Sequence, residues 1–155
     1  MSKESILIVT PELRGMVSVG GLAEVPIALA YALRKAGNEV RIAMPYYEYL
    51  NIEEKVSKGL SPIWQGNLHL GGLPPAKIFQ TTVRFKEEDI PLYLVKGHPH
   101  FDQVKTVAGV YAPDPKPYFF FPAAILRFLD NCKDWVPDII HCHDYHTGLL
   151  SVYLR

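Results

Sequence analysis

A strand, a helix and a second strand follow one another within the first 45 residues, and this order constrains the fold more than any other feature. Residues 5–10 read Ser-Ile-Leu-Ile-Val-Thr, an apolar run typical of a strand buried on both faces. Residues 20–36 have helical periodicity and end before Gly37-Asn38, after which residues 38–45 predict another strand. Two strands joined by a helix in this way pair in parallel through a right-handed crossover. The sequence therefore predicts an α/β fold with a mostly parallel sheet.

The middle of the chain predicts a different kind of structure. Residues 63–70, 76–85 and 90–96 have the composition of short strands, and they are separated by a Gly-Gly-Leu-Pro-Pro segment at 71–75 and a charged segment at 86–89. Glycine, proline and charged turns between short strands are typical of antiparallel hairpins. We therefore expect a β-hairpin insertion in the α/β frame.

Beyond this insertion the α/β pattern returns. Residues 97–117 predict a long loop rich in proline and aromatic residues, and loops of that length usually carry function. An apolar helix is expected over residues 118–129, with Pro122 tolerated near its first turn. Residues 135–142 predict another buried strand, and residues 148–154 predict a final helix.

Composition narrows the possible functions. The 155 residues include sixteen basic and sixteen acidic side chains, so the formal net charge is zero. Without a basic excess, the chain has no electrostatic basis for binding nucleic acid or a membrane surface. No apolar run approaches the ~20 residues of a membrane span, and the N-terminus does not resemble a secretory signal. With Cys132 and Cys142 as its only cysteines, the sequence favours a reduced, cytoplasmic protein in which both thiols are small buried residues.

The pair Gly20-Gly21 lies where the first strand gives way to the first helix. A helix that begins with glycines leaves backbone N–H groups bare at its positive dipole end, which suits a phosphate or another anion. The pair lacks the Gly-x-Gly-x-x-Gly spacing of dinucleotide-binding turns, and the chain has no P-loop pattern. A tight turn without a ligand is the alternative interpretation.

A second candidate site follows the predicted strand 135–142. His141, His143, Asp144 and His146 lie at its carboxyl end, where open α/β sheets bind their ligands. Three imidazoles and a carboxylate so close together are compatible with zinc, which would indicate a His-rich metallohydrolase. The dinuclear pattern His-x-His-x-Asp-His is not matched, because the aspartate is one place early. The alternative is a packed His141, with Asp144 as the N-cap of the last helix.

Four stretches, taken in order, resemble bacterial glycogen synthases and plant starch synthases. Residues 19–25, Val-Gly-Gly-Leu-Ala-Glu-Val, are similar to the end of the family's Lys-x-Gly-Gly-Leu-Ala-Asp-Val. Residues 33–47 are similar to Leu-x-x-x-Gly-His-x-Val-x-x-x-x-Pro-x-Tyr, and residues 98–102 with the helix 118–129 form the third stretch. Residues 137–149 are close to Pro-Asp-x-x-His-x-His-Asp-Trp-His-Thr-x-Leu.

The resemblance implies a two-lobed glycosyltransferase of the GT-B type, whose lobes are Rossmann-like sheets with the active site between them. Residues 1–155 would be its N-terminal, acceptor-side lobe, incomplete and without the second lobe. Members of the family move glucose from ADP-glucose, or sometimes UDP-glucose, to the non-reducing end of an α-1,4-glucan with retention of configuration. They need no metal or other cofactor. The implied partners are a glucan, a nucleotide sugar and a separate C-terminal lobe.

The resemblance also implies which residues face the donor substrate. The residues that match the glycine segment of the family would lie beside the phosphates of the nucleotide sugar: Ser18, Gly20, Gly21, Leu22 and Glu24. The residues that match its histidine segment would line the catalytic cleft near the sugar and the acceptor: His143, Asp144 and His146.

Three departures from the family pattern bear on activity. The family's lysine falls on Ser18, its aspartate on Glu24 and its tryptophan on Tyr145. Arg14 is close enough in sequence to supply the charge of the missing lysine. Because the second lobe supplies most donor contacts in this family, we expect that the chain alone does not transfer glucose. A non-catalytic α/β module that binds glucan or a partner lobe is the alternative.

Overall fold

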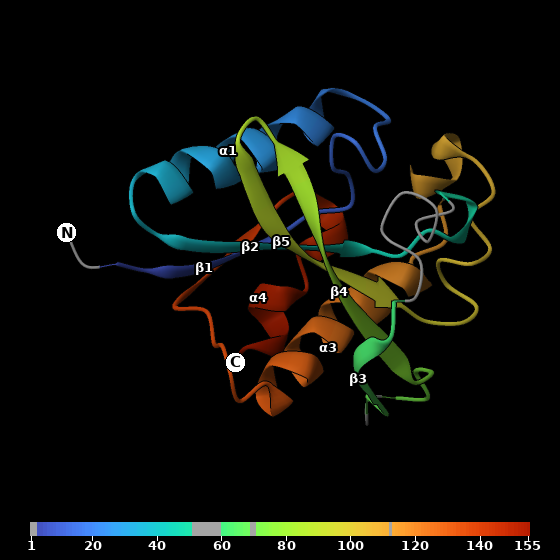
Figure 1. The fold of residues 1–155 in the computed structure, drawn as a ribbon. Coiled ribbons are helices and arrows are strands. Elements are labelled where there is room, and N and C mark those ends of the chain that lie inside the picture. The colour runs from blue at the N-terminus through green and yellow to red at the C-terminus, as the bar shows by residue number, and fades with distance from the viewer. Residues whose placement is uncertain (1–2, 51–59, 69–70, 112) are drawn as a thin grey trace.

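The computed structural model describes residues 3–50, 60–68, 71–111 and 113–155 (Figure 1). Its helices and strands, in chain order, are β1 Ser5–Val9, α1 Glu24–Lys35, β2 Glu39–Pro45, β3 Pro62–Gly66, β4 Ala76–Phe85, β5 Glu88–Lys96, α3 Lys116–Asn131, β6 Ile139–Cys142 and α4 Leu150–Tyr153. Short 3-10 helices occur at Gly21–Ala23 (η1), Glu48–Leu50 (η2), Val107–Tyr111 (η3) and Tyr145–Thr147 (η4).

The strands of the described residues form a six-stranded sheet in the order β3-β4-β5-β2-β1-β6. β1 pairs in parallel with β2 on one side and with β6 on the other, and β2 pairs in parallel with β5. β4 runs antiparallel to β5 and to β3. The expected α/β frame with a hairpin insertion is therefore confirmed. Because β5, β2, β1 and β6 are parallel, their carboxyl ends share one edge of the sheet.

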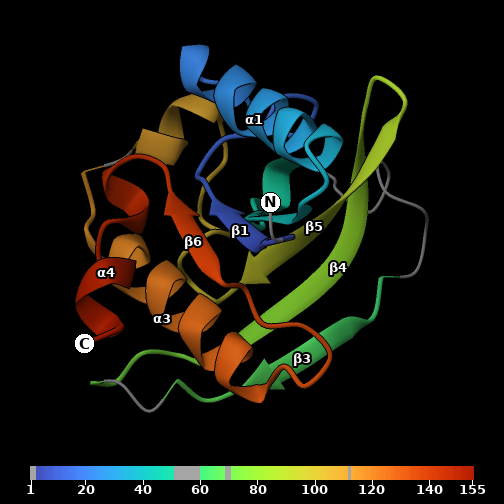
Figure 2. The same cartoon turned by 90° about the vertical axis from the view of Figure 1, so that its left-hand side faces the viewer.

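Helices cover both faces of the sheet. α1 lies on one face, and α3 and α4 lie on the other (Figures 1 and 2). α1 presents Ile27 and Ala30 to the sheet, one turn apart, while Val25 and Ala28 face outward. This amphipathic pattern is the one that the sequence predicts for the helix of a βαβ unit.

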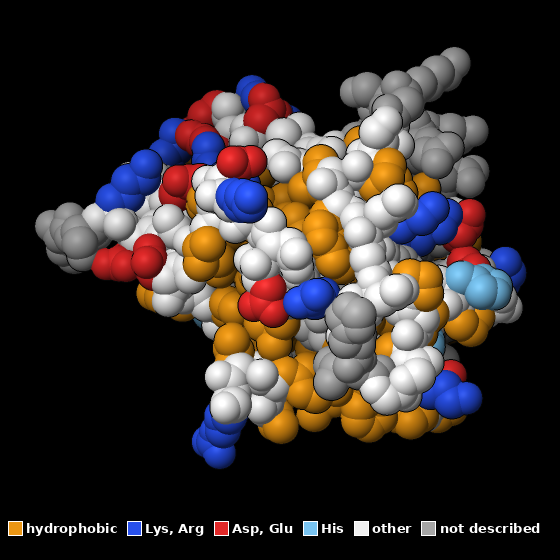
Figure 3. Space-filling view, turned by 90° about the horizontal axis from the view of Figure 1, so that it is seen from below, with side chains coloured by type: hydrophobic (Ala, Val, Ile, Leu, Met, Phe, Trp, Pro, Cys, Tyr) orange, Lys and Arg blue, Asp and Glu red, His pale blue; other side chains and the backbone are white. Residues whose placement is uncertain are grey.

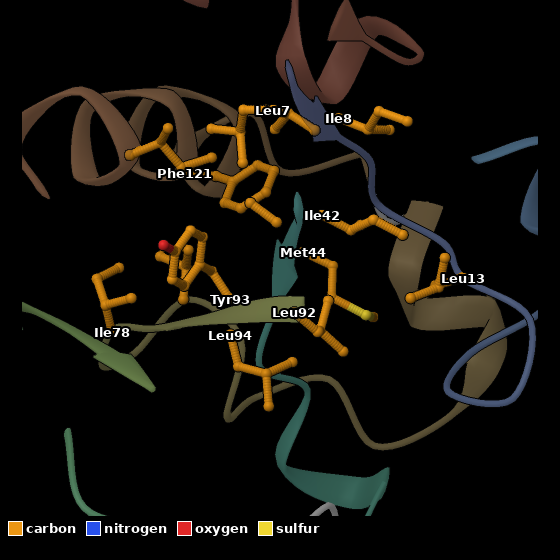
Figure 4. Close-up of a cluster of buried hydrophobic side chains, with 14 of the residues drawn as sticks. Leu7, Ile8, Leu13, Ile42, Met44, Ile78, Leu92, Tyr93, Leu94 and Phe121 are labelled. Atoms are coloured by element: carbon orange, nitrogen blue, oxygen red, sulfur yellow. The ribbon is translucent and has the colours of Figure 1, made fainter. Parts of the chain in front are cut away.

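The core lies on both faces of the parallel strands (Figure 4). Leu7 points toward Phe121 of α3, whereas Ile8, Ile42 and Leu92 point to the opposite face, and these four strand residues are at most 1% exposed. Fully burying one such side chain contributes ~1.5–3 kcal/mol, so the parallel strands and α3 hold the carboxyl edge of the sheet in place.

The outer strand β6 departs from the prediction. Residues 135–142 were expected to form a buried strand, but β6 is only four residues long and Ile139 is 46% exposed. The reason is its position at the edge of the sheet, where it has β1 on one side only. Cys142, expected to be buried, is exposed for the same reason, and Cys132 is half-buried.

Hydrophobic side chains also remain exposed around β6 and α4. Val136, Val152 and Leu154 are each about 60% exposed, at 64%, 58% and 59%. The side of the molecule on which α3, α4 and β3 lie in Figure 1 shows a broad apolar surface when it is seen from below (Figure 3). A surface of this kind is typical of a contact with another segment or partner.

Two helix predictions need correction. The first helix was expected from Gly20, but α1 begins at Glu24, after the separate 3-10 turn η1. Pro122 was expected near the first turn, but α3 begins at Lys116 and Pro122 is its seventh residue. Since proline has no N–H, the helix forgoes one backbone hydrogen bond there, and the burial of Pro122 and its neighbours in the core compensates.

Other observed boundaries differ from the predicted ones by a few residues. The strand predicted over 63–70 is β3, which ends at Gly66, and residues 69–70 lie outside the described residues. The last helix was expected over 148–154 and is the short α4. Within the described residues, no helix is both long and apolar enough to cross a membrane.

Candidate functional site

The topology brings the two predicted segments together. The glycine segment follows β1 and the histidine segment follows β6, and these two strands are neighbours that run in parallel. The register pairs Val9 with Cys142, and the amide of His143 continues the ladder by donating to the Val9 carbonyl over 2.9 Å. Both segments therefore leave the same edge of the sheet side by side.

The glycine pair is open to solvent. Gly20 and Gly21 are exposed, and a Cβ atom placed on either would meet no other atom within 4 Å. Gly20 has an extended backbone, with φ −146° and ψ −158°, and η1 follows it directly. The space in front of these two residues is thus available to a ligand.

The carboxyl group of Glu12 occupies part of the predicted anion site. Glu12 is 1% exposed, and its Oε2 accepts hydrogen bonds from the amides of Val19, over 2.6 Å, and Gly20, over 3.1 Å. The expectation that these glycine amides are bare is therefore wrong for Gly20. A backbone amide beside a carboxyl group is the arrangement that a helix start favours, and here the chain supplies the acidic group itself.

The other predicted donor-side residues surround the glycines. Ser18 and Glu24 are exposed, and Leu22 is half-buried. Arg14 reaches the same loop, where its Nη1 lies 2.9 Å from Oε2 of Glu24, and both side chains are more than half exposed. Arg14 therefore places a positive charge in the loop where the family has its lysine, although this charge is paired with Glu24.

Asp144 has an unusual backbone conformation. Its φ is +65° and its ψ is 168°, a combination that only glycine adopts easily. Its carboxyl group caps the turn that follows by accepting the Tyr145 amide over 2.6 Å. The expected N-cap role is therefore confirmed, although the capped element is η4 and not α4.

His146 is buried beneath this turn. Its side chain is 3% exposed, its Nε2 lies 3.2 Å from the Val110 carbonyl, and its Nδ1 lies 3.7 Å from Oδ2 of Asp144. Burial lowers the pKa of His146, so at neutral pH the ring is uncharged and Nε2 is best assigned as the donor to Val110. Thr147 fixes the turn by donating to the carbonyls of His143 and Asp144, each over 3.0 Å.

His143 lies on the open side of the turn. Its ring stacks on that of His141 with 4.6 Å between centroids and planes 1° apart. Burial, and to a lesser degree the neighbouring His141, lowers the pKa of His143. Its Nε2 is buried and has no hydrogen-bond partner among the described residues. A ligand could bond to this nitrogen only after the ring or its neighbours move.

Tyr111 joins the two segments, although it comes from a distant loop. Its hydroxyl donates to Oε1 of Glu12, and its ring edge contacts the ring of His146 with 4.8 Å between centroids. Burial and the Glu12 carboxyl group raise the pKa of Tyr111 well above its ordinary value. The tyrosine thus stays protonated and holds Glu12 beside the histidine segment.

A cavity of about 270 Å³ lies next to this cluster. It is lined in part by His100, Asp114, Tyr118 and His146. Tyr118 comes from the first turn of α3, and its ring edge contacts His146 with 4.5 Å between centroids. Burial raises the pKa of Tyr118, with a further contribution from Tyr145. The cavity is therefore lined mainly by aromatic and apolar side chains, with Lys105 and Asp114 as its charged residues.

Sequence reasoning missed three residues of this region: Glu12 and Tyr111, which join the two segments, and Tyr118, which lines the cavity. Glu12 and Tyr111 are 99 residues apart, so no local pattern could connect them. The available signal was the position of Glu12, an acidic residue that closely follows a fully apolar strand.

The geometry does not favour the metallohydrolase. His143 stacks on His141, whereas His146 turns inward to the Val110 carbonyl, so the three imidazoles do not converge. Among the residues that the structure describes, no group of three His, Cys, Asp or Glu side chains is arranged to hold a metal ion. The Asp144 carboxyl group is instead used as a cap.

Comparison with known proteins decides the family. The family model described as the starch synthase catalytic domain matches residues 5–155. This chain belongs to that family. It is 35% identical to glycogen synthase 2 of Geobacter sulfurreducens over 157 residues and 37% identical to glycogen synthase of Trichodesmium erythraeum over 152 residues. Each match covers 97% of this chain.

This chain also shares its fold with a solved structure of the family. The catalytic domain of starch synthase IV from Arabidopsis thaliana, bound to ADP and acarbose, superposes with a TM-score of 0.73 over 97% of this chain at 24% identity. This chain spans 30% of the length of the two glycogen synthases and 30% of the Arabidopsis chain. The resemblance inferred from the four sequence stretches is therefore confirmed, as the N-terminal part of these enzymes.

Proposed function

We propose that this chain supplies part of the first lobe of a retaining glucosyltransferase, which moves glucose from a nucleotide diphosphate sugar to an α-1,4-glucan. ADP-glucose is our preferred donor, with UDP-glucose as the second choice. The observation that carries this proposal is the chain of contacts from Gly20 through Glu12 and Tyr111 to His146, which joins the open glycine pair to the histidine segment. The cytoplasm, where such a donor would be found, is the proposed location.

In this proposal the glycine segment binds the donor phosphates and the histidine segment binds the sugar. The space before Gly20 and Gly21 would admit the diphosphate, and the positive end of the helical segment η1–α1 would stabilise the charge that develops on it. The hydroxyl of Ser18 and the charge of Arg14 lie at the same loop. On the other side, Nε2 of His143, which is buried and unpaired here, would orient a sugar hydroxyl after a movement that uncovers it.

A second lobe remains necessary in this proposal. The apolar side chains exposed around β6 and α4, such as Ile139 and Val152, support contact with further protein. We expect the purified chain to give no transfer of radiolabelled glucose from ADP-glucose to glycogen. Extension of glycogen by the chain alone would contradict this part of the proposal.

Donor binding can be tested without turnover. Calorimetric titration of the chain with ADP-glucose should detect binding, and Gly20→Val should weaken it about tenfold, which corresponds to ~1.4 kcal/mol. Valine tolerates the extended backbone of Gly20, and a Cβ there meets no atom within 4 Å, so its side chain should mainly fill the ligand space. Ala28→Val, on the exposed face of α1, is the matched control. Equal ADP-glucose affinity in all three proteins would contradict the proposed donor site.

One observation favours the non-catalytic alternative. Glu12 already occupies the amides of Val19 and Gly20, and Ser18 provides no positive charge. A module that binds glucan or a partner lobe would need neither group for phosphate. The same titration separates the two functions, because glucan binding without any response to ADP-glucose supports the alternative.

A further inference from the structure

A second hollow lies far from the proposed donor site. It has a volume of about 530 Å³ and lies between β3, the middle of β5 and the end of α3. The start of α3 contributes Tyr118 to the first site, and its last residue, Asn131, lines this hollow. Thirteen residues of helix separate the two, which is ~20 Å at 1.5 Å per residue. The volume is typical of a small-ligand pocket.

The wall of this hollow is aromatic. Trp64, Phe128 and Tyr93 line it in a row, with 6.3 Å between the ring centroids of Trp64 and Phe128 and 5.0 Å between those of Phe128 and Tyr93. Tyr93 and Phe128 are buried, whereas Trp64 is partly exposed. Gly66 leaves room for the indole, because a Cβ on Gly66 would lie 2.7 Å from Cζ2 of Trp64. A partly exposed indole of this kind offers a flat apolar face.

The rim is polar and balanced in charge. Gln80, Lys133 and Asp134 line the hollow, are exposed, and make no hydrogen bond or ion pair with another described residue. Asn131 donates from Nδ2 to the Arg127 carbonyl, which leaves its Oδ1 available. The two opposite charges at positions 133 and 134 do not favour an anion such as a nucleotide.

The charge of Arg41, at the floor, is also compensated. Its Nη2 pairs with Glu39 over 3.0 Å, its Nη1 donates to the Tyr93 hydroxyl, and its guanidinium lies 4.4 Å from the ring centroid of Trp135. A neutral ligand with many hydroxyl groups and apolar C–H faces fits this combination of aromatic wall and mixed rim.

We infer that this hollow binds a short stretch of α-1,4-glucan, with a sugar ring stacked on Trp64 and its hydroxyls bonded to Gln80, Asn131 and Lys133. The inference rests on the proposed function for its choice of glucan. A polymer held here, ~20 Å along α3 from Tyr118 of the first cavity, raises the local concentration of its other segments at that end of the molecule. The hollow would therefore be an anchoring site for the acceptor polymer.

The two tryptophans of the chain provide the readout. Trp64 lines the hollow and Trp135 lies beneath Arg41, so tryptophan fluorescence reports on this region alone. Titration with maltoheptaose should shift or quench the emission, and glycogen should bind more tightly per chain than maltoheptaose. Cellohexaose, a β-1,4 glucan, is the control ligand. No fluorescence change with maltoheptaose or glycogen, together with no heat of binding, would overturn the inference.

Variants assign the binding to this hollow. Trp64→Ala should weaken maltoheptaose binding at least about tenfold in calorimetry, and Gly66→Ala should weaken it by displacing the indole. Gln80→Ala and Asn131→Ala change exposed side chains, and Asn131→Ala loses only one hydrogen bond at the end of α3, so both keep the test valid if Trp64→Ala fails to fold. Unchanged maltoheptaose affinity in Asn131→Ala and Gln80→Ala would overturn the assignment.

The test of the glucan hollow can fail independently of the test of the proposed donor site. Gly20→Val should leave maltoheptaose binding unchanged, and Asn131→Ala should leave ADP-glucose binding unchanged. If ADP-glucose binds and maltoheptaose does not, the anchoring site is wrong and the proposed function stands. If maltoheptaose binds at Trp64 and ADP-glucose does not bind, the anchoring site stands and the donor site is wrong.

Discussion

At the scale of single residues, the glycine segment depends on Glu12. Its carboxyl group accepts hydrogen bonds from the Val19 and Gly20 amides and from the Tyr111 hydroxyl. We expect Glu12→Ala to lower the free energy of unfolding by about 2 kcal/mol, because three donors lose their acceptor, whereas Glu12→Gln should cost about 1 kcal/mol. Urea denaturation checks both values. Equal losses in the two variants would show that packing, and not hydrogen bonding, accounts for the effect.

Asp144 combines a strained backbone with a useful side chain. Its positive φ with ψ near 168° is unfavourable for any residue with a Cβ. We therefore expect Asp144→Gly to be more stable than Asp144→Ala by about 1–2 kcal/mol, although both lose the cap on the Tyr145 amide. The comparison of the two urea midpoints tests the strain alone. If alanine is as stable as glycine at this position, the backbone is not strained in solution.

At the scale of elements, two glycines with different surroundings show where the packing is tight. A Cβ on Gly97, which directly follows β5, would lie 1.9 Å from Cζ of the fully buried Phe120, whereas a Cβ on Gly20 would meet nothing within 4 Å. Gly97→Ala should therefore destabilise the fold by about 1–3 kcal/mol through overpacking against α3. Gly20→Ala is the matched control and should change the stability by less than about 0.5 kcal/mol. Equal thermal midpoints would mean that α3 moves freely relative to β5.

The strands and helices could be predicted from sequence where the signal is local. An apolar run predicted β1, and the turn residues on both sides of residues 76–85 predicted the observed bounds of β4. The burial of β6 could not be predicted in this way, because Ile139 and Ile140 look like core residues and only the sheet order places them at an edge. The start of α1 was also missed, since the glycines favour η1, a tighter turn that continues the helical pattern.

The candidate site was predicted in part for the same physical reason. Both predicted segments follow strand ends, so the rule for parallel sheets was sufficient to place them at one edge. The contacts that join them are long-range: Tyr111 approaches from a loop whose sequence contains no periodic signal. Residues that act through tertiary contacts of this kind require the fold to be known.

At the scale of the whole molecule, α3 separates two regions with different chemistry. The proposed donor site lies at the carboxyl ends of the parallel strands. The hollow proposed to bind glucan lies toward their amino ends, where the guanidinium of Arg41 packs on the ring of Trp135. The carboxyl-end region holds His100, His143 and His146, and burial is the main cause of the lowered pKa in all three. Acid should therefore affect the donor-site end of the molecule before the rest.

The sign of this effect follows from proton linkage. A histidine whose pKa is lowered in the folded state binds its proton more readily in the unfolded chain. The free energy of unfolding therefore falls as the pH drops below the pKa of histidine in the unfolded chain, about 6.5. Each such histidine contributes at most about 1.4 kcal/mol per pH unit below that value. Carboxyl groups with lowered pKa, such as Glu87 at about 2 through its bonds to Tyr31 and Lys35, contribute only at lower pH.

Urea midpoints measured from pH 7.5 to pH 5.5 should therefore decline, and His146 should account for part of the decline. His146→Gln keeps an N–H that can donate to the Val110 carbonyl and removes the titrating ring, so its stability should depend less steeply on pH. His98→Gln is the control, because the His98 side chain is 79% exposed. If His146→Gln and the parent chain show the same slope over this range, His146 is protonated equally in the folded and unfolded states, and the buried, uncharged ring that closes the crevice beneath Asp144 is not its state in solution.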